Sequence, residues 1–395
     1  MLTKKQLIDF ADLAIKIGVN LQKDQQLVIS CPIECADFAR TISLQAYLAG
    51  ARDVTVLWND EKFSRIRMEN ADVNALIDIP NWIVQQKKEY VAKNAAFITV
   101  LSSDPSIFEG IDIIKIKRYS KAYSIANIDF KNATMNNVVR WCVVSVPSAA
   151  WAAKVFGDCN QNEAMDKLWD AIAVTMRLNE NDPVAAWEEH IKKLNIRAQF
   201  LNESDFDSIH LQNSKGTDLI VGLPRGHIWT AAGEIAKDGV MFTANMPTEE
   251  IFTVPDRNRV NGKVVNALPL SYNGIIIDDF FVEFKNGKAI NYGAKIGEDA
   301  LRELINTDEG SHYLGEIALI GKNSPISNLK TLFYNTLFDE NASCHLAFGK
   351  GYPSTLKGGE QMTVKQLLKN GVNDSVEHCD FMIGTPDLNV TGIRK

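Results

Sequence analysis

Long hydrophobic runs are missing from this chain of 395 residues. No segment approaches the ~18 apolar residues that a membrane-spanning helix requires. The first residues, MLTKKQLIDFADLA, mix charges into the apolar positions that a secretory signal keeps uninterrupted. Cysteine is scarce, with 6 residues scattered along the chain, which indicates reduced thiols rather than a disulfide framework. We therefore predict a cytoplasmic protein with no membrane partner.

Positive charge is in deficit. Lys and Arg together number 42 against 49 Asp and Glu, and the formal net charge is -7. Nonspecific affinity for nucleic acid comes from clustered Lys and Arg, and the sequence contains no such stripe. We predict no nucleic-acid partner.

The common motifs of nucleotide and serine chemistry are also missing. No glycine-rich phosphate loop is present, and the glycines between 216 and 227 are typical of turns because no strand-to-helix transition follows them. The serine nucleophile motif Gly-x-Ser-x-Gly does not occur. By elimination, metal chemistry is the best remaining route to catalysis.

The length of the chain favours two domains. Up to about residue 190, strand-like and helix-like segments alternate, which predicts an α/β domain with a mainly parallel sheet over 1–190. The expected helices are Ala36 to Ala49, ended by Gly50, and Asn81 to Lys93. The expected strands are Gln26 to Cys31, Asp53 to Trp58, Ala96 to Leu101 and Val139 to Val146.

A different pattern follows. Residues 161 to 204 predict two helices separated at Pro183, which suits a first helical turn. Later, short strand-like runs at Asp218 to Leu223, Gly274 to Ile277 and Phe280 to Phe284 are separated by turns, and Asn286-Gly287 predicts a hairpin. We expect a mixed α+β domain over 206–395.

This second domain carries oxygen and nitrogen donors that suit divalent metals. If Val376 to Ile383 is a strand, His378 and Asp380 point to one face and Cys379 to the other. His345 would likewise face away from Cys344. The donors are Glu250, Glu316, Glu340, His345, His378 and Asp380.

Each donor also has a structural interpretation. His378 and Asp380 alone fit a solvated edge strand, and His345 alone fits a core histidine. Glu340 could belong to a helix start, and the pattern does not choose between Glu249 and Glu250.

Five segments of this domain resemble the M29 metallo-aminopeptidases, the aminopeptidase T, aminopeptidase S and PepS group. The segments are Met246 to Asp256, Pro269 to Gly274, Leu314 to Leu319, Phe333 to Leu346 and His378 to Gly384. From the resemblance we would expect relatives to continue for some residues beyond the end of this chain.

The resemblance implies an aminopeptidase that removes N-terminal residues from peptides, forms a dimer and uses two divalent metal ions (Zn, Co or Mn). It selects Glu250 over Glu249 as a ligand, groups Glu250 with the other five donors in one site, and matches Tyr352 to an active-site tyrosine. Paired metals can hold a bridging hydroxide as nucleophile, and Tyr352 could donate a hydrogen bond to the oxyanion. Glu249 is a candidate for binding the free amine of the substrate.

The charge of the donor set agrees with this prediction. Four carboxylates and two neutral imidazoles carry about -4 units of charge, which balances two divalent cations. Two other functions remain open: a two-metal phosphoesterase, for which Lys350 and Lys357 are weak phosphate-binding candidates, and a metal-stabilised peptide-binding protein without turnover.

Overall fold

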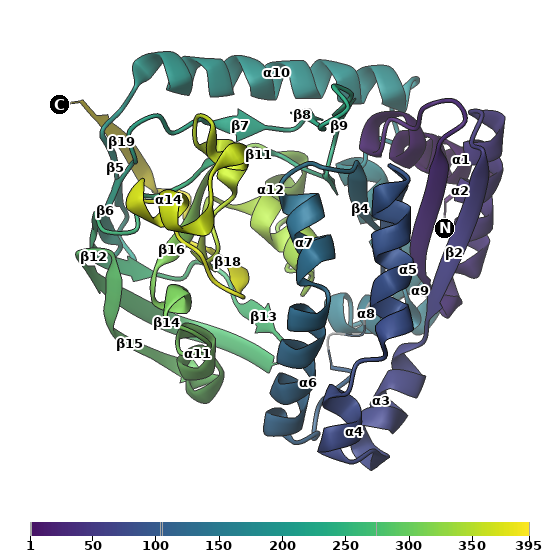
Figure 1. Cartoon of the computed structure of the whole chain (residues 1–395), viewed down its shortest axis with the longest axis horizontal. Coiled ribbons are helices and arrows are strands. Elements are labelled where there is room, and N and C mark those ends of the chain that lie inside the picture. Colours follow the sequence, from purple (N-terminus) through teal and green to yellow (C-terminus); the bar gives the residue numbers. More distant parts are fainter. Residues whose placement is uncertain (1, 103, 105, 274, 395) are drawn as a thin grey trace. The chain divides into compact units, whose positions relative to one another are not determined.

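The computed structural model describes residues 2–102, 104, 106–273 and 275–394, and the chain forms two compact units (Figure 1). The first unit comprises Met1–Lys192 and Ala232–Thr248, and the second comprises Lys193–Ala231 and Glu249–Lys395. The segment Ala232–Thr248 therefore belongs to the first unit, although the chain before and after it belongs to the second. None of the helices in the described ranges has the length and hydrophobicity of a membrane span.

The first unit contains a five-stranded sheet in the order β10-β4-β3-β1-β2, and all of its pairings are parallel. This confirms the predicted α/β class with a mainly parallel sheet. The ladder also includes β10 from the inserted stretch. The strands are β1 (Gln26–Pro32), β2 (Asp53–Asn59), β3 (Ala96–Leu101), β4 (Trp141–Ser145) and β10 (Asn245–Met246).

Helices cover both sides of this sheet, with α5 and α7 along one side and α1 and α2 along the other (Figure 1). Gly50, at φ 95°, follows α2 as predicted, in a conformation that glycine adopts without a steric penalty. The helices are α1 (Lys4–Leu13), α2 (Ala36–Leu48), α3 (Glu61–Asn70), α4 (Val73–Ile77), α5 (Asn81–Ala92), α6 (Ile113–Ala126), α7 (Ile128–Met135), α8 (Ala149–Val155) and α9 (Gln161–Thr175).

Helix α10 (Pro183–Ser204) carries the chain from the first unit into the second. Pro183 begins the helix, as predicted, because a proline in the first turn loses no intrahelical hydrogen bond. The first unit is completed by a short pair of strands, β8 (Glu234–Ile235) and β9 (Met241–Phe242).

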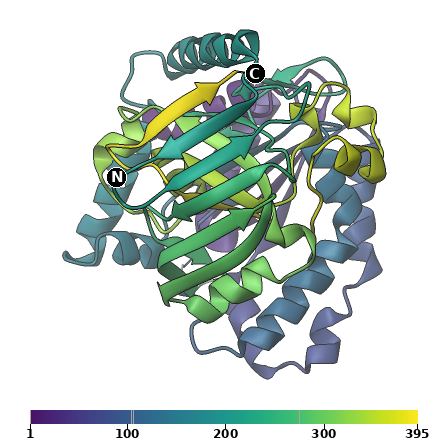
Figure 2. The same cartoon turned by 90° about the vertical axis from the view of Figure 1, so that its left-hand side faces the viewer.

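The second unit contains a seven-stranded sheet in the order β13-β14-β12-β6-β5-β19, with β15 paired to β14. Figure 2 shows its strands side by side, from the yellow β19 to the green β15. They are β5 (Ser208–Gln212), β6 (Asp218–Gly222), β12 (Val260–Val265), β13 (Leu270–Tyr272), β14 (Ile275–Lys285), β15 (Lys288–Ile296) and β19 (Asn389–Ile393).

The predicted hairpin joins β14 to β15, with Asn286 and Gly287 both at positive φ. The prediction of two short runs at 274–277 and 280–284 is wrong, because β14 is one strand through Asp278 and Asp279. Asp278 accepts a hydrogen bond from the Asn266 side chain, and Asp279 pairs with Lys295 at 2.9 Å. Gly274 lies outside the described residues.

A second sheet of this unit has the order β18-β17-β16-β11-β7 and is antiparallel throughout. Its strands are β7 (Thr230–Ala231), β11 (Glu250–Thr253), β16 (Leu314–Ile320), β17 (His345–Gly349) and β18 (His378–Met382). The remaining helices are α11 (Glu298–Ile305), α12 (Pro325–Leu329), α13 (Thr336–Asp339) and α14 (Val364–Lys369), with short 3-10 turns that include η4 (Glu340–Ala342).

Phenylalanines join the two sheets of the second unit. Phe381 of β18 lies 4.6 Å from Phe348 of β17 and 5.7 Å from Phe280 of β14, measured between ring centroids. Phe348 and Phe381 are fully buried, and each such ring contributes about 1.5–3 kcal/mol of transfer free energy. Because side chains alternate along a strand, this packing directs the neighbours of Phe381 and Phe348 to the opposite face.

Candidate metal centre

The predicted donors that belong to strands lie on the antiparallel β18-β17-β16-β11-β7 sheet of the second unit, on the face that points away from Phe348 and Phe381. Residues paired across antiparallel strands point to the same face, and Glu316, Ala347 and Asp380 form one such row over β16, β17 and β18. In the adjacent row His345 is paired with Ala318. Small alanine side chains, Ala318 and Ala347, therefore lie beside the donors on this face.

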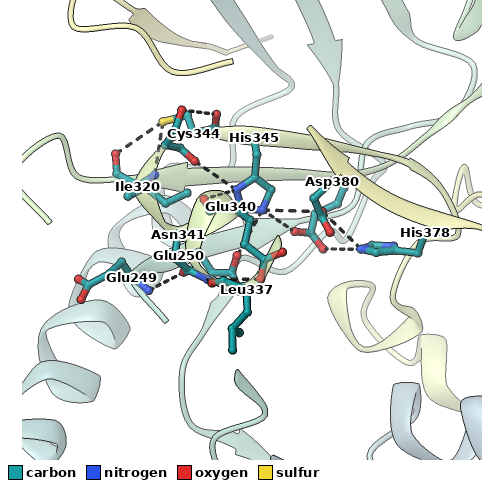
Figure 3. A network of polar contacts seen from close by, with 12 residues as sticks. Glu249, Glu250, Ile320, Leu337, Glu340, Asn341, Cys344, His345, His378 and Asp380 are labelled. Carbon is teal, nitrogen blue, oxygen red and sulfur yellow. Dashed lines mark hydrogen bonds and ion pairs between the residues drawn. The ribbon is translucent and has the colours of Figure 1, made fainter. Parts of the chain in front are cut away.

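The donor atoms converge closely. His345 Nε2 lies 3.3 Å from Glu250 Oε2, 3.3 Å from Glu316 Oε1 and 3.9 Å from Asp380 Oδ1. His378 Nε2 lies 3.8 Å from Glu316 Oε2 and 3.6 Å from Asp380 Oδ1. Figure 3 shows the labelled side chains Glu250, His345, His378 and Asp380 directed toward one another.

These donors form two groups that could each hold a metal ion. One group is Glu250, Glu316 and His345, and the other is Glu316, His378 and Asp380; within each, the donor atoms lie within 4.8 Å of one another. Glu316 belongs to both groups. Its two oxygens face different imidazoles, Oε1 toward His345 and Oε2 toward His378.

Backbone carbonyls orient both imidazoles. His378 Nδ1 lies 2.7 Å from Lys350 O, and His345 Nδ1 lies 2.9 Å from Glu340 O. A carbonyl oxygen can only accept a hydrogen bond, so each Nδ1 carries a hydrogen. In the neutral ring, Nε2 then presents a lone pair to the carboxylates, the usual arrangement of a metal-binding histidine.

The donor set fits divalent cations. A lone pair on Nε2 and carboxylate oxygens would repel one another unless a proton or a cation lay between them. Within the two groups, the separations of 3.3–3.8 Å exceed the ~2.7–2.9 Å of charge-assisted hydrogen bonds but suit two ligands that share an ion at about 2.0–2.2 Å. Asp380 Oδ1 is buried and has no hydrogen-bond partner within the described part of the chain, which points to the same need.

Without a cation, protons compensate the charges. Burial, with Asp380 and Glu250 nearby, raises the pKa of Glu316 to about 7. Burial alone would lower the pKa of His378, but the Asp380 carboxylate raises it to about 9. Burial would also lower the pKa of His345, but the nearby carboxylates of Glu250 and Glu316 outweigh it and raise this pKa well above the ordinary value. The centre therefore holds protons that a metal would displace.

Glu340 comes from outside the strands. It lies on η4, is buried, and its Oε1 accepts a hydrogen bond from Asn341 Nδ2 at 3.3 Å. Burial, followed by Asp380 and Glu250, raises its pKa well above the ordinary value, so its carboxylate lies near theirs. Neither of the two groups found among the described residues includes it.

Tyr352 lies beside the cluster. Its ring centroid is 5.1 Å from the imidazole of His378 and 5.7 Å from the ring of Phe252, in edge-to-face contacts. Tyr352 also packs against the buried cluster of Phe252, Ala318 and Ile320, whose residues share strands with the donors. The structure therefore brings together the tyrosine and the histidine that the sequence separates.

Glu249 does not join the cluster. In extended chain, neighbouring residues point to opposite sides, and Figure 3 shows the Glu249 carboxylate directed away from Glu250 and His345. Its backbone N–H donates to Asn341 Oδ1 at 2.7 Å. The proposed contact of Glu249 with a substrate amine stays a prediction that this geometry does not support.

Sequence reasoning missed several supporting residues. Asn341, the Lys350 carbonyl, Ala318 and Ala347 all hold or border the donors. The two alanines could have been recognised in the sequence. In Glu316-x-Ala318 and His345-x-Ala347 a small residue follows a donor by two positions, the spacing that places both on one face of a strand. No local pattern indicates the role of Asn341, because its partner Glu249 is 92 positions away in the sequence.

The fold and the donors define a metalloenzyme-like protein with a buried centre of carboxylates and imidazoles. A sequence model of the thermophilic metalloprotease family (M29) matches residues 3–395. The chain belongs to this family of metallo-aminopeptidases and is a hydrolase of the peptidase class, which confirms the resemblance seen in its motifs.

Individual aminopeptidases are similar to this chain over nearly its whole length. The chain is 44% identical over 389 residues to aminopeptidase AmpS of Bacillus subtilis, covering 98% of this chain and 95% of the relative. It is 37% identical over 390 residues to aminopeptidase T of Thermus thermophilus, covering 99% and 95%. The solved structure of wild-type AmpT from Thermus thermophilus superposes with a TM-score of 0.92 at 37% identity and covers 99% of this chain and 96% of that chain.

Proposed function

We propose that this protein removes N-terminal residues from peptides with two divalent metal ions, of which Zn, Co and Mn suit the donors. The observation that carries the proposal is the sharing of Glu316 between two groups of three donors. The residues proposed to hold the ions are Glu250, Glu316, Glu340, His345, His378 and Asp380.

Bound ions would supply Lewis acidity toward the scissile carbonyl and would lower the pKa of the attacking water. The chain supplies orientation. Lys350 O and Glu340 O fix the two imidazoles, and Glu316 reaches both groups. The burial of these side chains reduces the screening of their charges by water.

Tyr352 is the proposed hydrogen-bond donor to the oxyanion that develops on the substrate. With Tyr352→Phe we expect kcat to fall by roughly 10²- to 10³-fold, because the hydroxyl would act mainly in the transition state. KM and metal content should change little, since the ring and its contact with His378 remain. Steady-state kinetics with metal analysis checks this, and a kcat equal to that of the parent would remove Tyr352 from catalysis.

Adjacent glutamates allow a matched comparison. Glu250→Gln should lower metal content, because Glu250 lies 3.3 Å from His345 in the cluster, whereas Glu249→Gln should keep the parental content. The amine-binding role proposed for Glu249 further predicts a raised KM for aminoacyl substrates. Metal analysis and kinetics of both variants decide these points. Equal KM values for Glu249→Gln and the parent would exclude the amine role.

We further propose that the protein is a cytoplasmic homodimer acting on peptides with a free N-terminus. The six cysteines are free thiols, which agrees with a reducing compartment.

Hydrolysis of a leucyl chromogenic amide, compared with a phosphodiester, tests the function. We expect the metal-loaded protein to hydrolyse the amide alone. Lys350, one of the two candidates for binding a phosphate, pairs with Asp374 at 3.7 Å. Hydrolysis of the phosphodiester alone would indicate a phosphoesterase, and metal binding without turnover of either substrate would indicate a binding protein.

A further inference from the structure

Asn341 is a fully buried amide at the edge of the metal centre (Figure 3). Its Oδ1 accepts the backbone N–H of Glu249 at 2.7 Å. Its Nδ2 donates to Leu337 O at 3.0 Å and to Glu340 Oε1 at 3.3 Å. The side chain therefore uses its acceptor and its donors at once.

These bonds join the two segments that carry Glu250 and Glu340. The N–H of Glu249 belongs to the residue directly before β11, which begins with Glu250. Leu337 O belongs to α13, directly before the η4 turn that carries Glu340. One amide thus fixes the start of one donor strand and the side chain of a donor from outside the sheet.

Three substitutions at this position would each disturb the arrangement. Aspartate has the acceptor but, when ionised, no donor, and it would face the Glu340 carboxylate with a like charge. Glutamine is longer by one methylene in a site with no exposed area. Alanine removes all three bonds.

We propose that Asn341 is a positioning residue for the metal centre, which holds the Glu340 carboxylate and the start of the Glu250 strand in the arrangement that the ions require. This rests on the proposed function, because Glu340 and Glu250 are its proposed ligands. Asn341 touches neither ion nor substrate in this role and acts through the two glutamates.

The chain offers a closely matched control in Asn266, which is also fully buried in the second unit. Its Oδ1 accepts the backbone N–H of Phe280 at 2.8 Å. Its Nδ2 donates to Leu268 O at 3.0 Å and to Asp278 Oδ1 at 2.9 Å. Asn266 therefore makes the same kinds of bond as Asn341, but to residues outside the metal centre.

The test compares Asn341→Asp with Asn266→Asp. Both metal-stripped variants should melt below the parent, since each loses two donor bonds. Only Asn341→Asp should lose Zn²⁺ affinity, by about tenfold or more, the size of effect seen when the support of a ligand is removed. Affinity is measured by competition with a chromogenic zinc chelator. Saturating Zn²⁺ should restore part of kcat in Asn341→Asp.

Equal Zn²⁺ affinities of the two variants would overturn the proposal. If Asn341→Asp does not fold, Asn341→Ala and Asn266→Ala provide the same comparison, because alanine leaves room for water to meet the freed backbone groups. A parent protein without aminopeptidase activity would refute the proposed function. The affinity comparison would still decide the role of Asn341.

Discussion

Glu316→Gln should remove metal binding at both groups of donors and lower kcat/KM by at least about 10³-fold, more than the loss of one oxyanion donor costs. The reason is that Glu316 alone belongs to both groups found in the described chain. Glutamine keeps the shape but removes a negative charge and one lone-pair oxygen. Metal analysis and hydrolysis of a leucyl amide measure the two effects.

The fold should survive this substitution. Burial raises the pKa of Glu316 to about 7, so its neutral form already costs little in the metal-free protein. The metal-free variant should therefore melt at or above the metal-free parent. Glu283→Gln, in β14 and 4.0 Å from Lys263, serves as a control carboxylate outside the centre. Parental metal content and rate in Glu316→Gln would refute the shared-ligand arrangement.

Exhaustive chelation should abolish hydrolysis, and Zn, Co or Mn should restore it. It should also lower the melting temperature, because ligands that bind only the folded state stabilise it and the remaining carboxylates repel one another. Activity assays and thermal unfolding of chelated and reloaded protein check both effects. Full activity after complete removal of metal would exclude the metal mechanism.

Metal rebinding should depend on pH with a defined sign. In the metal-free centre the Asp380 carboxylate outweighs burial and raises the pKa of His378 to about 9, so the ring holds a proton below that pH. Since only the neutral imidazole binds metal, rebinding releases protons and the apparent affinity should rise as pH increases toward about 9. An affinity that falls over this range would contradict the assignment of His378 as a ligand.

The features that the sequence predicts correctly follow from the composition and spacing of neighbouring residues. β3 matches its predicted range of Ala96 to Leu101 because a β-branched apolar run suits a buried parallel strand. The two-residue period of a strand likewise explains why His378 and Asp380 share a face while Phe381 enters the core. These features depend on neighbours in the chain.

The features that the sequence did not predict depend on contacts between residues far apart in the chain. β14 continues through Asp278 and Asp279 because partners from other segments, Asn266 and Lys295, satisfy their carboxylates. The direction of the Glu340 carboxylate depends on Asn341 and on charges of other strands. Family resemblance, not the local pattern, selects Glu250 over Glu249 as the proposed ligand, and in the structure the Glu250 carboxylate lies 3.3 Å from His345 while that of Glu249 is directed away.

Anomalous X-ray scattering from crystals of the zinc-loaded protein tests the central claim most directly. We predict two zinc peaks about 3.5–4 Å apart, with the Glu316 carboxylate between them and His345 and His378 on different ions. A single peak, or peaks remote from Glu316, would contradict the two-metal centre.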